Sequence, residues 1–176
     1  MKKALSFLYL IAAMLVCLPL TSCGNSTKNK LVGRWEFSES LPEIDGNVRG
    51  TLSLQKGDSF RMDFVMTLKE EEADGTKVTM TVTGYQSGEW DLMGDDMLYC
   101  DVTSCNAKVT KAKVYTWLTG WYDADSSDLE EFNALFIGNI KAALTTTSID
   151  DIISLESNSF TTRDDEGTTI TYTRLN

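Results

Sequence analysis

Apolar and polar residues alternate along much of the chain after residue 31. In the clearest run, residues 60–68, every second residue is Phe, Met or Leu, and the residues between them are mostly polar or charged. Residues 78–82 repeat the pattern with Val and Met separated by Thr. A period of two predicts β-strands with one buried face and one exposed face. The abundance of Thr, Val, Tyr and Phe supports strands.

Short turn sequences separate these runs: KGD at 56–58, ADG at 73–75, MGDD at 93–96 and DDEG at 164–167. The predicted strands are 31–39, 48–56, 59–70, 76–86, 88–93, 96–103, 107–119, 150–156, 158–164 and 167–175. Because short turns join most neighbours, the strands should pair as an antiparallel meander. Such a meander hides its edges by closing, so we expect an all-β fold, an up-and-down β-barrel of about 8–10 strands.

One face of these runs is strongly apolar and would point into the barrel. Methionine recurs on this face, and its flexible side chain adapts to irregular apolar shapes. A barrel of about eight strands either fills with side chains or holds one small ligand. The pattern leaves a packed core and a lined cavity open as alternatives. The residues of the candidate ligand cavity are Met62, Phe64, Met66, Val78, Met80, Val82 and Trp90.

One segment departs from the period of two. Ser127 and Glu130 have the spacing of a capping box, which predicts the start of a helix. Apolar residues then recur at steps of three and four, which predicts one amphipathic helix over 128–144. A stripe of this kind usually packs on its own domain. The stripe consists of Leu129, Phe132, Phe136, Ile140 and either Ala143 or Leu144.

The N-terminus has the layout of an export signal. Lys2 and Lys3 precede the uncharged apolar run 5–20, which is shorter than the roughly 20 residues that span a bilayer. The run ends in Leu-Thr-Ser-Cys, a border that resembles the bacterial lipobox. The resemblance implies that 1–22 is a lipoprotein signal peptide, that Cys23 carries diacylglycerol, and that its new amine is acylated. The alternative is a plain secretory signal with a chance cysteine.

The residues after Cys23 bear on location. The stretch 23–30 is small and polar and predicts a flexible tether between a lipid and the domain 31–176. In lipoproteins of this kind, an Asp after the lipidated cysteine favours retention in the inner membrane. Position 24 is Gly, so the resemblance implies lipid anchoring in the bacterial outer membrane, with the periplasmic face favoured over the cell surface.

Composition narrows the chemistry. The chain of 176 residues has a formal net charge of −10, which argues against nucleic acid as a partner. It contains no histidine, so Ser-His-Asp and Cys-His catalysis and histidine metal sites are excluded. Any enzyme would have to use carboxylates, Lys, Tyr or Ser. We therefore expect a non-catalytic protein without a cofactor.

The two ends of the domain carry a further resemblance. Gly33 and Trp35 lie on the first predicted strand, and Arg174 lies near the end of the last. In this respect the chain resembles the lipocalin-like superfamily, and more narrowly the small lipocalin-like lipoproteins of Gram-negative bacteria. A second G-x-W begins at Gly88 and ends at Trp90. The resemblance implies that Arg174 packs across Trp35, in a cation–π contact, and seals the closed end of the barrel.

The resemblance and the apolar inner face together favour binding of a small, mostly apolar ligand. The alternative is a solid barrel that serves as a structural or protein-interaction module of the envelope, with an unknown protein partner. The acidic groups at 70–72, 95–96 and 164–165 fall in predicted turns and are expected to be solvated. The acidic segment 123–128 fails the EF-hand spacing, so we expect no metal site.

Cys100 and Cys105 are the thiols that could form a disulfide. In one straight strand they would lie about 16 Å apart, too far to bridge. If the residues between them formed a hairpin loop, the thiols could face each other. The sequence leaves both arrangements open.

Overall fold

A computed structural model describes residues 23–41 and 45–176, so the predicted signal peptide 1–22 lies outside the described residues. The elements are α2 (Cys23–Leu31), β1 (Gly33–Leu41), β2 (Gly46–Leu54), β3 (Ser59–Glu71), β4 (Lys77–Met93), β5 (Met97–Thr116), β6 (Gly120–Asp123), α3 (Ser126–Leu144), β7 (Ser148–Leu155), β8 (Ser159–Arg163) and β9 (Thr169–Arg174). The predicted all-β class with one long helix is confirmed.

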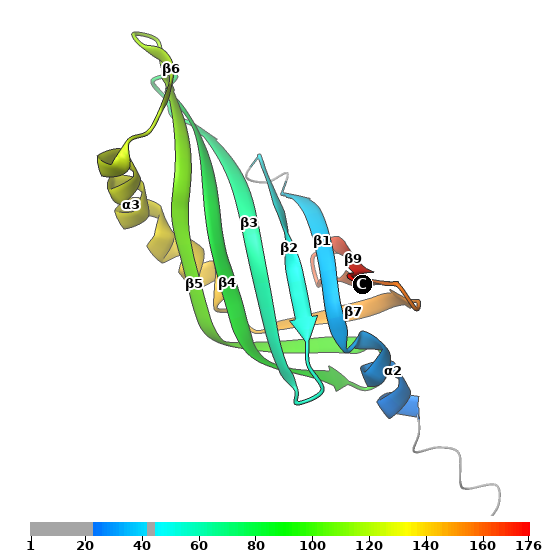
Figure 1. Cartoon of the computed structure of the whole chain (residues 1–176). Helices are drawn as coiled ribbons and strands as arrows, with labels where there is room; N and C mark the ends of the chain where they lie inside the picture. The colour runs from blue at the N-terminus through cyan, green and yellow to red at the C-terminus, as the bar shows by residue number, and fades with distance from the viewer. Residues whose placement is uncertain (1–22, 42–44) are drawn as a thin grey trace, which may run out of the picture.

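The strands pair antiparallel in the order β4-β3-β2-β1-β9-β8-β7-β5-β6, and β4 also pairs with β5. This extra pairing makes a ring of eight strands from β1 to β5 and β7 to β9 (Figure 1). The short strand β6 stands outside the ring and pairs with the end of β5. Ring closure satisfies the backbone groups that an open sheet would leave at its edges.

Two predicted breaks between strands are absent. The predicted segments 76–86 and 88–93 form the single strand β4, and the predicted segments 96–103 and 107–119 merge into the single strand β5, which ends at Thr116. The β4–β5 register shifts between Thr81 and Val82 and again between Ser87 and Gly88. The break predicted at residue 87 therefore coincides with an irregularity that bends a continuous strand instead of ending it.

A belt of alternating large and small residues crosses the inside of the ring. Phe37, Gly50, Phe64, Gly84 and Ala107 are successive partners across five strands. A Cβ at Gly50 would overlap the backbone oxygen of β3, and one at Gly84 would overlap that of β5. Glycine at these two positions lets neighbouring strands approach and curl, as ring closure requires.

The long helix α3 runs beside β5. Strand β5 pairs with β7 at one end and with β6 at the other, and α3 lies along the stretch between these pairings (Figure 1). The Asn133 amide receives a hydrogen bond from the Val109 N–H at 2.9 Å and donates one to the Val109 carbonyl at 3.1 Å. The helix thus takes the place of a strand at this edge. It precedes the last three strands, as predicted.

The start of α3 differs from the prediction. The N-cap is Asp125, whose carboxylate accepts from the N–H groups of Ser127 and Asp128, and Asp128 bonds back to the Asp125 N–H. Asp at both positions closes a capping box two residues earlier than Ser127 and Glu130 would. The predicted apolar stripe is confirmed: its members packed against the core are Leu129, Phe132, Phe136, Ile140 and Leu144.

The predicted flexible tether is instead helical. Residues 23–31 form α2, which lies against the lower end of the ring in Figure 1. The Lys28 ammonium lies 2.6 Å from the Asp58 carboxylate and 2.7 Å from the Asp91 carboxylate, and Leu31 is fully buried. Composition alone suggested flexibility, but these long-range ion pairs and the buried leucine hold the segment in place.

Candidate functional site

At the lower end of the ring, Trp35 and Arg174 are partners in the β1–β9 register. The guanidinium carbon of Arg174 lies 4.0 Å from the centre of the Trp35 ring, and Trp35 is fully buried. The guanidinium also donates to the carbonyls of Lys30 and Val32, the latter at 3.1 Å, and to that of Ser157 at 3.0 Å. This one side chain therefore ties β9 to β1 and to the end of α2.

Gly33 leaves space for the Arg174 guanidinium. Its φ is +153°, a conformation that side chains rarely adopt, and a Cβ would collide with the Arg174 guanidinium. The Trp35 indole N–H donates to the Leu31 carbonyl at 2.7 Å, so the buried ring keeps its polar atom satisfied. Gly33, Trp35 and Arg174, which the sequence placed at opposite ends of the domain, are brought together here.

The residues predicted to line a ligand cavity belong to one continuous core. Phe64, Val78, Met80, Val82 and Trp90 are buried, and the partly buried pair is Met62 and Met66. Trp90 lies near α2, and the ammonium of Lys28 on this helix is 5.2 Å from its ring centre. Its indole N–H donates to the Gln55 carbonyl at 3.0 Å. Trp90 thus packs at the lower end of the ring, beside α2, and does not share a site with Met80.

A pocket of about 850 Å³ lies at the opposite end, between α3 and the ends of β3 and β4. Its size is typical of small-molecule sites. Met80 is the only residue of the predicted cavity set among those that line this pocket. Its apolar floor is formed by Leu68, Met80, Phe136, Ile140 and Ala143. Its polar rim is formed by Asp45, Lys69, Glu70, Glu71, Glu72 and Asn139.

Sequence reasoning missed most of this pocket. The helical stripe containing Phe136 and Ile140 was assigned to core packing, and the run 70–72 to solvated turns. The stripe does pack on the core but is only partly covered at this end of α3. The three glutamates are exposed, as predicted, but Glu70 and Glu71 belong to strand β3 and not to a turn. The spacing of the stripe carries no signal for this gap, because other segments provide the cover. Its position opposite Met80 depends on the fold and could not be derived from spacing.

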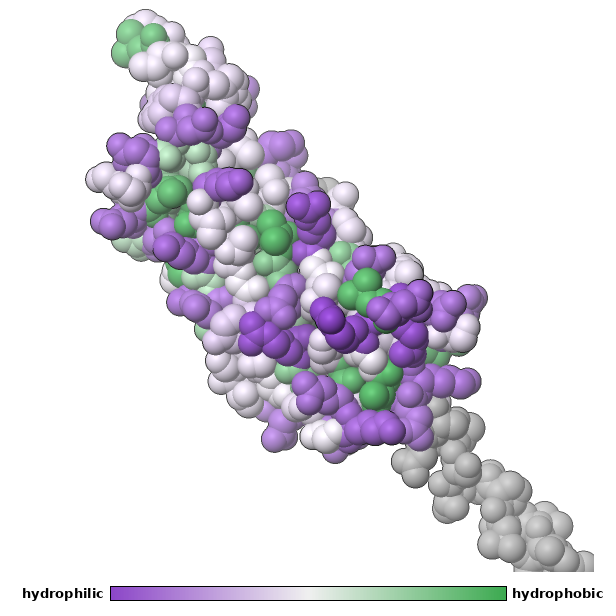
Figure 2. All heavy atoms as spheres, viewed as in Figure 1, coloured by the Kyte–Doolittle hydropathy of each residue, from purple (hydrophilic) through white to green (hydrophobic). Residues whose placement is uncertain are grey.

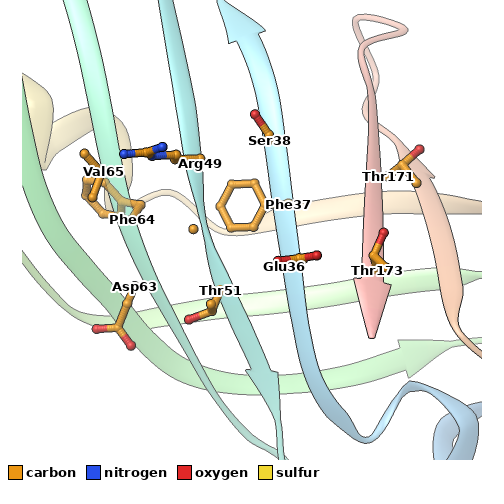
Figure 3. Close-up of a pocket in the computed structure, with 11 residues that line it drawn as sticks. Glu36, Phe37, Ser38, Arg49, Thr51, Asp63, Phe64, Val65, Thr171 and Thr173 are labelled. Atoms are coloured by element: carbon orange, nitrogen blue, oxygen red, sulfur yellow. The ribbon is translucent and has the colours of Figure 1, made fainter. Parts of the chain in front are cut away.

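A second depression of about 850 Å³ lies on the outer face of β1, β2, β3 and β9 (Figure 3). Its outward side chains are mostly polar or charged, among them Glu36 from β1, Arg49 from β2 and Thr173 from β9. Asp63 at its border pairs with Arg61 at 2.7 Å. Since most of its lining consists of exposed sheet surface, it offers an apolar ligand less cover than the pocket beside α3.

Several inward-facing groups have perturbed acidity. Burial raises the pKa of Asp150 and of Glu39, and the Asp164 carboxylate nearby adds to both shifts. Burial also raises the pKa of the Cys100 thiol to about 12 and that of Tyr172 further above its usual range. In all four groups burial therefore disfavours the charged form. Neither Glu39 nor Asp150 lines either pocket described above.

The disulfide alternative is wrong. Cys100 and Cys105 both lie in the continuous strand β5, opposite Trp90 and Gln86, and both are free thiols. The residues between them stay extended, so the hairpin that a bridge requires does not form. Among residues 23–41 and 45–176, no group of three His, Cys, Asp or Glu side chains could hold a metal ion.

An aromatic hairpin protrudes at the upper end, where β5 turns into β6. Its large side chains are exposed, with 79% of Trp117, 73% of Leu118 and 55% of Trp121 accessible to solvent. Figure 2 shows a small apolar group at this tip, and further apolar groups scattered over a mostly polar face. Exposed clusters of this kind mark interaction surfaces.

The chain matches no model of a known protein family, and no curated protein matches its sequence. No helix in the described part of the chain is long and apolar enough to cross a bilayer.

Proposed function

We propose that this protein is an envelope lipoprotein that binds a small, mostly apolar ligand in a lipocalin-like β-barrel, without catalysing a reaction. The observation that carries the proposal is the pocket between α3 and the ends of β3 and β4. Its floor combines an aromatic ring, Phe136, with the flexible side chain of Met80 and the branched side chains of Leu68 and Ile140. Side chains of this kind bury apolar surface and adapt to its shape.

The ligand would occupy one end of the barrel and not its whole length. The belt that includes Phe37 and Phe64 crosses the middle of the ring, and both rings are buried. Tyr172 stacks on Phe160 at 4.4 Å between ring centres and lies 5.6 Å from Phe37. The barrel is therefore filled below the pocket, which limits the ligand to a small molecule.

A second candidate function is a solid barrel that binds a protein partner of the cell envelope. The exposed aromatic hairpin favours it, because Trp and Tyr are enriched in the energetically dominant residues of protein interfaces. The two functions differ in the part of the molecule they need. Ligand binding needs Ala143 and the pocket floor, whereas partner binding needs Trp117 and Trp121.

The anchor is part of the same proposal and rests on the Leu-Thr-Ser-Cys border. Cys23 would carry the lipid on the periplasmic face of the outer membrane, at the first residue of α2. Cys23→Ser should abolish incorporation of labelled palmitate in growing bacteria, because the lipid is attached through the thiol. Labelling that persists in this variant would contradict the anchor.

Native mass spectrometry of protein extracted from bacterial outer membranes tests ligand binding. We expect an extra mass that is lost on unfolding and cannot be assigned to the anchor. Ala143→Trp should remove it, because the new indole fills the pocket from an exposed position on α3. Ala142→Trp is the matched control, since Ala142 is exposed on the same helix and does not line the pocket. A bare lipoprotein mass in all three samples, even after incubation with a lipid extract, would refute ligand binding.

A further inference from the structure

The rim of the pocket beside α3 is strongly acidic. Four of its side chains are carboxylates, Asp45, Glu70, Glu71 and Glu72, against a single cation, Lys69. A ligand in the pocket would meet a negative potential at the point where its polar end leaves the apolar floor.

The cations near the rim are already paired. The Lys69 ammonium lies 3.2 Å from the Asp45 carboxylate, and the Lys77 ammonium lies 3.0 Å from the Glu71 carboxylate. Within the described residues, Glu70 and Glu72 form no ion pair. Two carboxylates at the rim are therefore not neutralised by any cation among residues 23–41 and 45–176.

The floor and the rim select different parts of one molecule. Leu68, Met80, Phe136 and Ile140 favour an apolar tail. The rim favours a positively charged head and disfavours a carboxylate or phosphate, because a like charge would be brought beside Glu70 and Glu72. An anionic head would need Lys69 as its partner, and Asp45 already engages that side chain.

We propose that the pocket binds amphipathic cations, with the apolar tail against the floor and an ammonium group between Glu70 and Glu72. This inference rests on the proposed ligand-binding function and adds the chemical class of the ligand. The separation of floor from rim also fixes its orientation, with the tail directed toward Met80 and the head toward the turn between β3 and β4.

Three probes with the same tail test the charge preference: octyltrimethylammonium, octanol and octanoate. Binding would be measured by isothermal titration calorimetry on the full-length protein in zwitterionic nanodiscs, with empty nanodiscs subtracted. We expect the cation to bind about three- to tenfold more tightly than octanol, and octanoate to bind more weakly than octanol. Equal affinity for all three probes, or tighter binding of octanoate, would overturn the inference while leaving apolar ligand binding intact.

Variants assign the preference to the rim. Glu70→Gln with Glu72→Gln should bring the cation to the affinity of octanol and leave octanol binding unchanged. Glu130→Gln with Glu131→Gln removes the same charge from exposed positions on α3 that do not line the pocket, and should preserve the preference. If the protein with Glu70→Gln and Glu72→Gln still binds the cation more tightly than octanol, the preference does not come from the rim.

The tryptophan variants separate this inference from the proposed function. Ala143→Trp should weaken all three probes and Ala142→Trp should weaken none. If the cation binds equally well to Ala143→Trp, it binds elsewhere and the inference is refuted. If no probe binds the unaltered protein, the proposed function fails together with the inference.

Discussion

Replacing Arg174 by methionine should remove most of the contacts that this side chain makes at the lower end of the ring. Methionine keeps much of the apolar stem but loses the charge and all donors. The contact with the Trp35 ring at 4.0 Å is worth about 1 kcal/mol. The partly buried bond to the Val32 carbonyl adds about 1.5 kcal/mol, because the donor is charged. The two exposed bonds, to Lys30 and Ser157, add about 0.5 kcal/mol in total after screening by water.

Arg174→Met should therefore lower the free energy of unfolding by about 3 kcal/mol. Equilibrium urea unfolding followed by circular dichroism measures this, as a fall of about 1–3 M in the midpoint at unchanged slope. The free energy of unfolding of Arg174→Lys should lie between that of the unaltered protein and that of Arg174→Met, because one ammonium cannot reach three carbonyls at once.

Arg163→Met is the matched control. Arg163 forms an exposed ion pair with Asp151 at 3.1 Å, and such pairs contribute less than about 1 kcal/mol. If Arg174→Met costs no more than Arg163→Met, the closure of the ring does not depend on the guanidinium, and the reasoning fails.

Three further predictions follow from buried features. Gly84→Ala should destabilise the fold by about 2 kcal/mol or more, because its Cβ would overlap the backbone of β5. Gly138→Ala on α3, where a Cβ meets open space, should stabilise the fold by about 0.5–1 kcal/mol. Urea unfolding measures both changes, and an equal change in the two variants would contradict the prediction. Asp150→Asn should stabilise the protein at neutral pH, because burial raises the folded pKa and stability is lost as pH rises above the ordinary value of 3.8; a gain that persists unchanged below that pH would contradict the assignment. Maleimide should modify Cys105 well before Cys100, which is buried and has a pKa raised to about 12; equal rates would contradict that burial.

The alternation of residues predicted where most of the strands lie, although not where β4 and β5 continue without a break. In β3, Phe60 and Phe64 are buried and Arg61 is exposed, as a period of two requires. This pattern is local, so it survives in any fold that buries one face of the strand. The helical stripe of α3 was predictable for the same reason, because its spacing is set by the helix itself.

Features that depend on partners distant in sequence were not predictable. Gly88 was predicted to begin a new strand, yet it lies inside β4, at an irregularity where β4 approaches the backbone of β5. Lys28 was assigned to a tether, yet Asp58 in a turn and Asp91 in β4 bind it from far along the chain. In each case the local sequence fits two conformations, and only the neighbouring segment decides between them.

The docked helix α2 has a consequence for how the molecule would stand on a membrane. A lipid on Cys23 would be joined to a rigid base and not to a swinging tether. In Figure 1, α2 and the turn between β3 and β4 lie at opposite ends of the ring, and the residues beside this turn line the pocket beside α3. Strand β4 alone holds 17 residues, about 55 Å of extended chain. The protein would then stand upright with its opening turned away from its own bilayer. A ligand would then enter the pocket from the aqueous space. Direct transfer of a ligand from a membrane would require a second membrane opposite the pocket.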